Sequence, residues 1–215
     1  MSLSLFAQAL IGIHVAFGSI ALLTGSLVLV LKKGDQRHQK IGKVFYSSML
    51  LSAVVACLLA LLPQHENVFL FCIGLFTIYL LLAGYRGLRF RKKNIPLQWD
   101  KRLALGLGIT GLVFITFPIL LYQKINVITS GFGVISLYLG LSDLRMLRRP
   151  QILQQRWLNI HLGKTIGAYL ASVTAFVVVN NVFVVPMWNW FGPSIIGSLY
   201  IVYWNKQLQK NNGTL

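Results

Sequence analysis

Residues 68–85 read VFLFCIGLFTIYLLLAGY, and residues 86–93, which follow at once, read RGLRFRKK. The first stretch has no charged residue and is close to the length of about 20 residues that an α-helix needs to cross a bilayer. The second stretch is rich in Arg and Lys, which collect in the cytoplasmic loops of membrane proteins. Together they predict a transmembrane helix that ends at a cytoplasmic loop.

The composition extends this interpretation to the whole chain. Of its 215 residues, 56% are hydrophobic and 11% are charged, whereas soluble domains carry about 25% charged residues. A soluble domain of this size cannot bury so much apolar surface. We therefore predict an integral membrane protein of the all-α class, with one transmembrane domain over residues 1–215 and no separate soluble domain.

Seven apolar runs are long enough to be spanning helices, and none shows the alternation that is typical of barrel strands. The predicted spans are residues 3–31, 41–62, 68–85, 103–122, 125–141, about 162–182 and about 185–204. The first run has no basic segment before it and is too long for a signal peptide, so we expect a retained helix. Residues 150–160 are predicted to form a separate, short interfacial helix.

The basic residues are distributed unevenly between the two sides of this arrangement. Seven spans put alternate loops on opposite sides, and 19 of the 20 Lys and Arg residues then share one side, with only Lys124 on the other. The positive-inside rule predicts an amino terminus outside, a carboxyl terminus inside, and a location in the cell's inner (plasma) membrane. The asymmetry explains the net charge of +16 without a nucleic-acid partner.

Charged side chains are expected at the ends of the spans and not in their middle. The seventh run has no lysine for a retinal Schiff base, and no span offers a carboxylate for a proton pump. Asp100, Asp143 and Lys164 are expected at the cytoplasmic surface. No two histidines are four residues apart, so the paired-histidine motif of seven-helix zinc amidases is missing.

His14 is the histidine placed deepest in a predicted span. Gly18, Ala21 and Gly25 share its helix face, and small residues let neighbouring helices approach closely. We predict that this face packs inside the bundle. Two roles for His14 stay open: a neutral imidazole that bonds to a neighbouring helix, or a ligand or proton-relay group.

Two further histidines have similar surroundings. His38 and His161 each lie at the cytoplasmic start of a span, and Tyr46 and Tyr169 follow eight residues later. The pair is either a weak internal repeat or two interfacial histidines beside basic loops. As a hypothesis, the two imidazoles approach each other on the cytoplasmic side and share one ligand or cofactor.

These residues resemble a bacterial multi-pass membrane family catalogued as domain of unknown function 2306. The resemblance rests on His14 with Gly18 and Gly25, Arg37-His38 with Gly42, Asp143-Leu-Arg145, His161 through Tyr169, Thr174-Ala-Phe176, and Asn180. It implies a multi-pass helical fold and draws attention to His14, His38, His161 and Asn180. It implies no particular reaction.

Three functions remain open from the sequence. A haem-binding or redox protein would hold haem b between histidines, with His14, His38, His161, Tyr169 and Asn180 as candidate cofactor-binding residues. A small-solute or metal permease would use His14 as a site within the membrane, with Ser172, Thr174 and Asn180 along a path. His14, His38 and His161 are the candidate metal ligands. A non-catalytic assembly subunit would bind other membrane proteins and would need none of them.

The predicted orientation is tested by fusing reporter enzymes after Gln64 and after Gln98. Because the two positions follow successive spans, we expect a reporter that works only outside the cytoplasm to be active after Gln64 and silent after Gln98. The same activity at both positions would reject this topology.

Overall fold

The computed structural model describes residues 3–212, and of Lys210, one of the basic residues counted above, it describes the backbone alone. Within these residues the chain is helical and contains no strand. The elements are α1 (Leu3–Val30), α2 (Gln36–Leu59), α3 (Val68–Gly87), the 3₁₀ helix η1 (Leu88–Arg91), α4 (Gln98–Tyr122), α5 (Val127–Met146), α6 (Pro150–Val179) and α7 (Pro186–Asn212). The predicted all-α bundle is confirmed.

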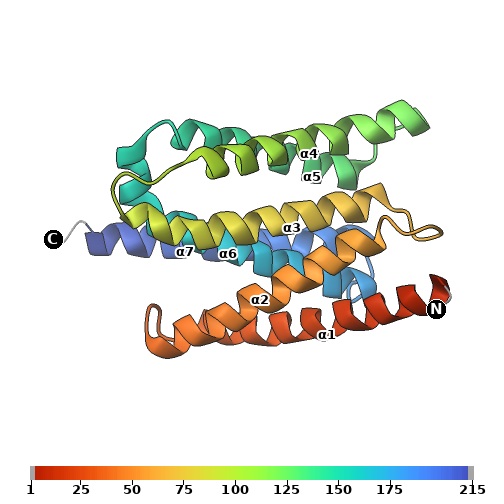
Figure 1. Cartoon of the computed structure of the whole chain (residues 1–215), viewed down its shortest axis with the longest axis horizontal. Helices are drawn as coiled ribbons and strands as arrows, with labels where there is room; N and C mark the ends of the chain where they lie inside the picture. Colours follow the sequence, from red (N-terminus) through yellow and green to blue (C-terminus); the bar gives the residue numbers. More distant parts are fainter. Residues whose placement is uncertain (1–2, 213–215) are drawn as a thin grey trace.

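The helices run lengthwise through the bundle, so that α1 begins at one end and α7 finishes at the other (Figure 1). Helices α3 and α6 pack against each other at the centre. On one side α2 packs on α3, and α1 packs on both α2 and α6; α7 packs on α6. Helices α4 and α5 form a hairpin that lies along α3 and touches α6 only slightly.

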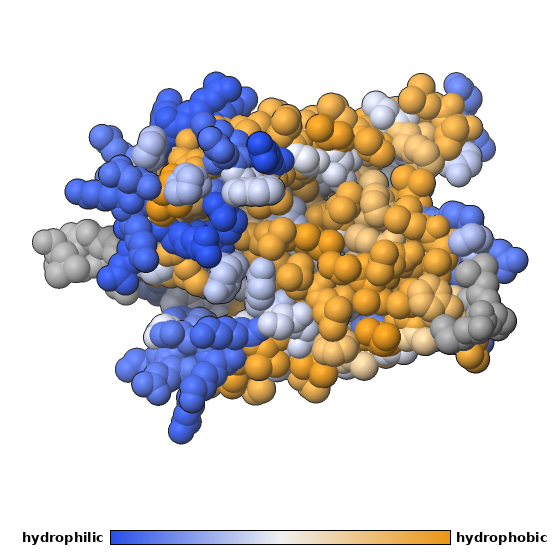
Figure 2. Space-filling view, viewed as in Figure 1, coloured by the Kyte–Doolittle hydropathy of each residue, from blue (hydrophilic) through white to orange (hydrophobic). Residues whose placement is uncertain are grey.

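Six of these helices, α1 to α6, are long and apolar enough to cross a membrane. Helix α7 has 27 residues but carries many Trp, Tyr and Asn side chains, and it is not among the six. A broad hydrophobic band separates two hydrophilic ends of the molecule (Figure 2). We call the more hydrophilic end, where segments 31–35, 88–97 and 147–149 lie, the cationic end. The protein is a multi-pass membrane protein.

Polar side chains cap several helix starts, and at α2 the cap moves the start away from the one that the apolar run predicted. The Asp35 side chain accepts a hydrogen bond of 2.6 Å from the backbone N–H of His38, so α2 starts at Gln36 and not at Ile41. Asn67 and Asn126 cap α3 and α5 in the same way. The Asp35 cap extends α2 into the polar region at the cationic end.

The separate interfacial helix predicted over residues 150–160 is wrong. Residues 150–179 form one continuous helix, α6, which starts with Pro150 in its first turn. Neither proline nor glycine interrupts the chain between Gln151 and Leu162, so nothing there breaks the hydrogen-bond ladder. The result is a helix of 30 residues that reaches well beyond the apolar run.

Glycines on α5 bring the α4–α5 hairpin together. A Cβ atom added at Gly133 would lie 2.8 Å from the Gly111 carbonyl oxygen, and one at Gly140 would lie 2.7 Å from the Ala104 carbonyl oxygen. Both contacts are with the backbone of α4, which cannot move aside cheaply. The two helices are therefore as close as their backbones allow.

The small-residue face of α1 does pack against its neighbours. A Cβ atom at Gly18 would lie 3.3 Å from Ser52 Oγ of α2, and one at Gly25 would lie 2.3 Å from the Tyr169 ring of α6. Ala21 between them is fully buried. The prediction that this face lies inside the bundle is confirmed.

Replacing Gly25 by leucine should therefore destabilise the fold. We expect Gly25→Leu to lower the free energy of unfolding in detergent by about 1–3 kcal/mol through overpacking against Tyr169. Gly12→Leu on the same helix is the matched control, because nothing lies within 4 Å of a Cβ atom there. Equal stability of the two variants would contradict the packing described.

Candidate functional site

The charged cluster at the contact of α3, α5 and α6 is built from Tyr79, Asp143 and Lys164. Lys164 Nζ on α6 lies 2.5 Å from Asp143 Oδ2 on α5 and 3.4 Å from Tyr79 Oη on α3. Tyr79 Oη donates to the same carboxylate oxygen. The side chains of Lys164 and Asp143 are only 9% and 14% exposed. One carboxylate therefore holds two donors from two other helices.

Two glycines on α3 allow this meeting. A Cβ atom at Gly84 would lie 2.8 Å from Thr165 Oγ1 and 3.2 Å from Lys164 Cβ, and one at Gly87 would lie 3.2 Å from the His161 backbone nitrogen. Helix α6 consequently lies very close to α3. Its lysine can then lie over the Tyr79 ring, with Nζ 4.8 Å from the ring centre.

The assignment of Lys164 to a cytoplasmic loop is wrong, because Lys164 lies within α6 and its side chain is buried. Lys164 sits halfway along α6, a helix that is long and apolar enough to span a membrane. The sequence-based boundary put the span start at about Leu162, because the polar residues before it were assigned to a loop. Asp143 is near the end of α5, as expected, but its side chain points into the bundle.

A second buried ion pair joins α3 to α4. Arg86 Nε lies 2.5 Å from Asp100 Oδ1, and Arg86 Nη2 lies 2.6 Å from Asp100 Oδ2, which is the bidentate geometry that strengthens such pairs. The Asp100 side chain is only 6% exposed. The α4–α5 hairpin is thus tied to the central helices by one ion pair from each of its two members.

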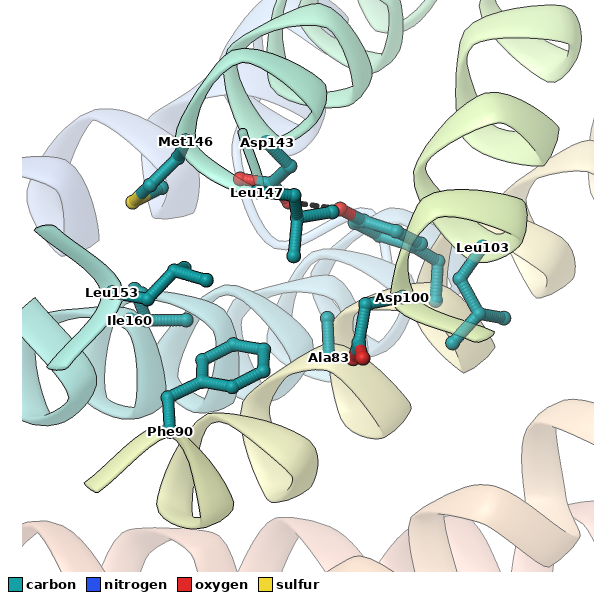
Figure 3. A pocket seen from close by; sticks show the side chains of 10 residues that line it. Ala83, Phe90, Asp100, Leu103, Asp143, Met146, Leu147, Leu153 and Ile160 are labelled. Carbon is teal, nitrogen blue, oxygen red and sulfur yellow. Dashed lines mark hydrogen bonds between the residues drawn. The ribbon is translucent and has the colours of Figure 1, made fainter. Parts of the chain in front are cut away.

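A small cavity lies between the two ion pairs. Its volume is about 20 Å³, and Tyr79, Asp100 and Asp143 supply its polar lining. Figure 3 shows Asp100 and Asp143 reaching it from different helices, with apolar side chains around them. A cavity of this volume has room for about one water molecule. Both carboxylates are therefore beside a space where water can reach them.

His14 lies on the face of α1 that packs against α2. Its Nδ1 is 3.0 Å from the Ser52 carbonyl oxygen and 2.9 Å from Ser52 Oγ, and that hydroxyl also lies 3.0 Å from the His14 carbonyl oxygen. Of the two roles left open, this geometry matches the histidine that bonds to a neighbouring helix. Its Nε2 has no part in these bonds.

His38 and His161 lie near the cationic end, close enough for their charges to interact. His161 Nδ1 bonds to the Gly84 carbonyl oxygen at 2.9 Å, whereas His38 Nδ1 is buried without a hydrogen-bond partner. Neither histidine lines the cavity of about 20 Å³ or a larger one of about 120 Å³ beside Lys92 and Gln154. Their shared site remains a hypothesis.

Tyr169 and Asn180 have different surroundings. Tyr169 joins three helices, because its hydroxyl lies 2.8 Å from Ser26 Oγ of α1 and its ring packs edge-on against Phe45 of α2. Asn180 ends α6 and donates to the Phe176 carbonyl oxygen at 2.8 Å, in the exposed turn at the far end of the bundle. Tyr169 follows His161 by eight residues on α6, whereas Asn180 lies at the carboxyl end of that helix.

The three candidate metal ligands do not come together. Among the residues that the structure describes, no three His, Cys, Asp or Glu side chains form a group able to hold a metal ion. His14 is on α1 and engaged by α2, while His161 is engaged by α3. The metal site proposed from His14, His38 and His161 stays a prediction that no group found among the described residues supports.

Sequence reasoning missed the cluster of Tyr79, Asp143 and Lys164. Two signals were available. Asp100 and Asp143 are two of only four acidic residues in a very basic chain, and each begins or ends a span. Lys164 lies three residues after His161, which puts the two on one face of a helix. Neither signal names the partner, because the pairing joins residues far apart in the chain.

The fold and this cluster define a multi-pass helical membrane protein with buried ion pairs. Residues 11–99 match the family described as predicted membrane protein, DUF2306. The family resemblance is confirmed over this segment, which contains His14, His38, Tyr79 and Arg86. Asp143 and Lys164 lie beyond it. Comparison with curated proteins and with solved structures gives no match.

Removing only one partner of the Lys164–Asp143 pair should destabilise the fold. Lys164→Met leaves an unpaired buried carboxylate, and we expect a loss of about 3–5 kcal/mol in the free energy of unfolding. Adding Asp143→Asn should restore most of it, because the pair is then neutral and Tyr79 keeps an acceptor.

The control for this series is Lys101→Met, at an exposed position on α4. It should change the free energy of unfolding by less than about 0.5 kcal/mol. Stability would be measured by reversible unfolding in detergent. If Lys164→Met lowered the free energy of unfolding no more than Lys101→Met, the ion pair would not contribute to the stability of the fold.

Proposed function

We propose that the protein is a proton-coupled permease for a small solute, and that the cluster of Tyr79, Asp143 and Lys164 binds the coupling proton. The observation that carries this proposal is the position of Lys164, halfway along a spanning helix and paired with Asp143. Ionisable groups inside a membrane bundle are costly and characteristically serve ion or substrate movement.

The chemistry needs only a proton from water. When Asp143 accepts a proton at its carboxylate, its charge disappears and the ammonium of Lys164 loses its counter-ion. An unpaired buried ammonium is unfavourable, so the pair then separates or draws in water. Proton binding is in this way converted into a force between α5 and α6.

The α4–α5 hairpin is the part of the fold that this force would move. The α4–α5 hairpin makes only slight contact with α6, and the Lys164–Asp143 pair bridges them near the cationic end. Toward the other end, rings from α3, α4, α5 and α7 interlock, with centres 5.3–6.4 Å apart. These rings are Phe69, Phe76, Phe114, Phe132 and Trp190. The hairpin is thus held by packed rings at one end and by the Lys164–Asp143 pair at the other. This arrangement favours a rocking motion of the hairpin about the aromatic end.

The proposal includes the orientation of the protein and the membrane in which it lies. We place the cationic end in the cytoplasm and the protein in the inner (plasma) membrane, on the strength of the charge asymmetry. Protons would then reach the small cavity beside Asp143 from the cytoplasmic side.

Spin labels on the hairpin and on α6 test the coupling. Labels at Leu141→Cys and Arg156→Cys, both exposed positions, report the distance between α5 and α6. The native Cys57 and Cys72 are buried and remain unlabelled. In the wild-type background the proposal predicts that the distance lengthens on acidification, because a proton bound at the cluster removes the attraction between Lys164 and Asp143.

Two variants sharpen this experiment. Asp143→Asn imitates the protonated carboxyl and should give the longer distance at every pH. Asp143→Asn with Lys164→Met has no charge left to titrate at this pair and should give one distance that does not respond to pH. A pH response that persists in the double variant would refute the proposal.

A haem-binding or redox function is the second candidate. It is favoured by one observation: Nδ1 of His161 is held by Gly84, which leaves Nε2 as the ligand atom, and His38 is near enough to interact. The absorbance of the purified protein distinguishes the two functions. A Soret band that His161→Ala abolishes would replace the permease proposal.

A further inference from the structure

A second polar cluster lies at the carboxyl end of α1, away from the ion pairs of α3 to α6. Lys33 Nζ donates to the carbonyl oxygens of Val28 and Leu29 at 2.9 and 2.5 Å. From α7, Tyr200 Oη donates to the same Leu29 oxygen at 3.4 Å. The end of α1, the loop after it and α7 therefore meet at one place near the cationic end.

Two buried polar atoms in this neighbourhood lack a hydrogen-bond partner. They are Nε1 of Trp204 on α7 and Nδ1 of His38 on α2. Lys33 lies near both residues: its ammonium is over the face of the Trp204 ring, 5.5 Å from the ring centre, and is close enough to His38 for their charges to interact. The His38 imidazole also interacts with the Val28 backbone, whose carbonyl oxygen accepts from Lys33 as well. Buried polar groups are normally satisfied, so these two need an explanation.

The hydrogen-bond donors at this place can be satisfied by an oxygen acceptor. An indole N–H can only donate, an ammonium has three donors of which two are used here, and Nδ1 of a neutral histidine donates in one tautomer. The nearest acid along the chain, Asp35, already accepts from the backbone N–H of His38. Partial burial lowers the pKa of Lys33 from its ordinary value, and a bound anion would offset that effect.

We propose that Lys33, His38 and Trp204 form a binding site for a phosphate group, with Trp204 Nε1 and the ammonium of Lys33 as its principal donors. The depth of the site suits a phospholipid headgroup, because Lys33 follows the last turn of α1 and His38 is in the first turn of α2. Basic pockets between helix ends are where anionic headgroups bind membrane proteins. This site is independent of the proposed permease cluster.

Native mass spectrometry of the full chain in detergent tests the site. The probes are phosphatidylglycerol, phosphatidylcholine and inorganic phosphate, each titrated separately. We expect saturable binding of phosphatidylglycerol that is weakened about five-fold by Lys33→Gln, since one basic residue near the headgroup contributes about that factor. Trp204→Phe, which keeps the ring and removes the N–H, should weaken binding as well. Lys32→Gln, the same charge change one residue earlier, should leave it unchanged.

The outcomes separate the sources and decide the proposal. Binding of phosphatidylglycerol and inorganic phosphate, both lost in Lys33→Gln and Trp204→Phe, supports a phosphate site open to either source; binding of the lipid alone supports a headgroup site. Equal weakening by Lys32→Gln and Lys33→Gln would overturn the proposal, because diffuse surface charge would then suffice. So would unchanged binding in Trp204→Phe, or no phosphate or phosphatidylglycerol bound to the wild-type chain.

Discussion

The ion pair between Lys164 and Asp143 is the interaction on which the relation between the two parts of the bundle depends. Lys164 is buried among the helices, and a buried ammonium group needs a carboxylate within reach. That carboxylate comes from α5, a helix that otherwise barely touches α6. The Lys164–Asp143 pair thus links α5 to α6, while the Arg86–Asp100 pair links α4 to α3.

The helices themselves were predictable because their signal is local. Uninterrupted apolar runs such as residues 68–85 define spans, and the basic residues after them define the loops. Helix starts were less accurate, since Asp35 and Pro150 extend α2 and α6 into polar sequence that hydropathy alone assigns to loops. The errors are therefore at helix ends, where capping and not hydrophobicity decides the conformation.

The candidate site was less predictable because its partners are distant in sequence. His14 could be placed against a neighbour from the spacing of Gly18 and Gly25, which is a property of one helix. The meeting of Tyr79, Asp143 and Lys164 depends instead on how closely α6 approaches α3, and that is set by Gly84 and Gly87. No pattern within a single helix contains this information. Histidines drew attention as titratable residues, whereas the buried charges were assigned to the surface.

The acidic residues explain why the cationic end has two kinds of site. Three of the four carboxylates lie there, and each already has a partner in the protein: Asp35 caps α2, Asp100 holds Arg86, and Asp143 holds Lys164. Among the described residues, the other basic side chains at that end form no salt bridge with a carboxylate. Buried cations are therefore balanced inside the bundle, while cations at the helix ends, such as Lys33, are balanced by anions that the surroundings supply, of which phospholipid phosphates are the most abundant at a membrane surface.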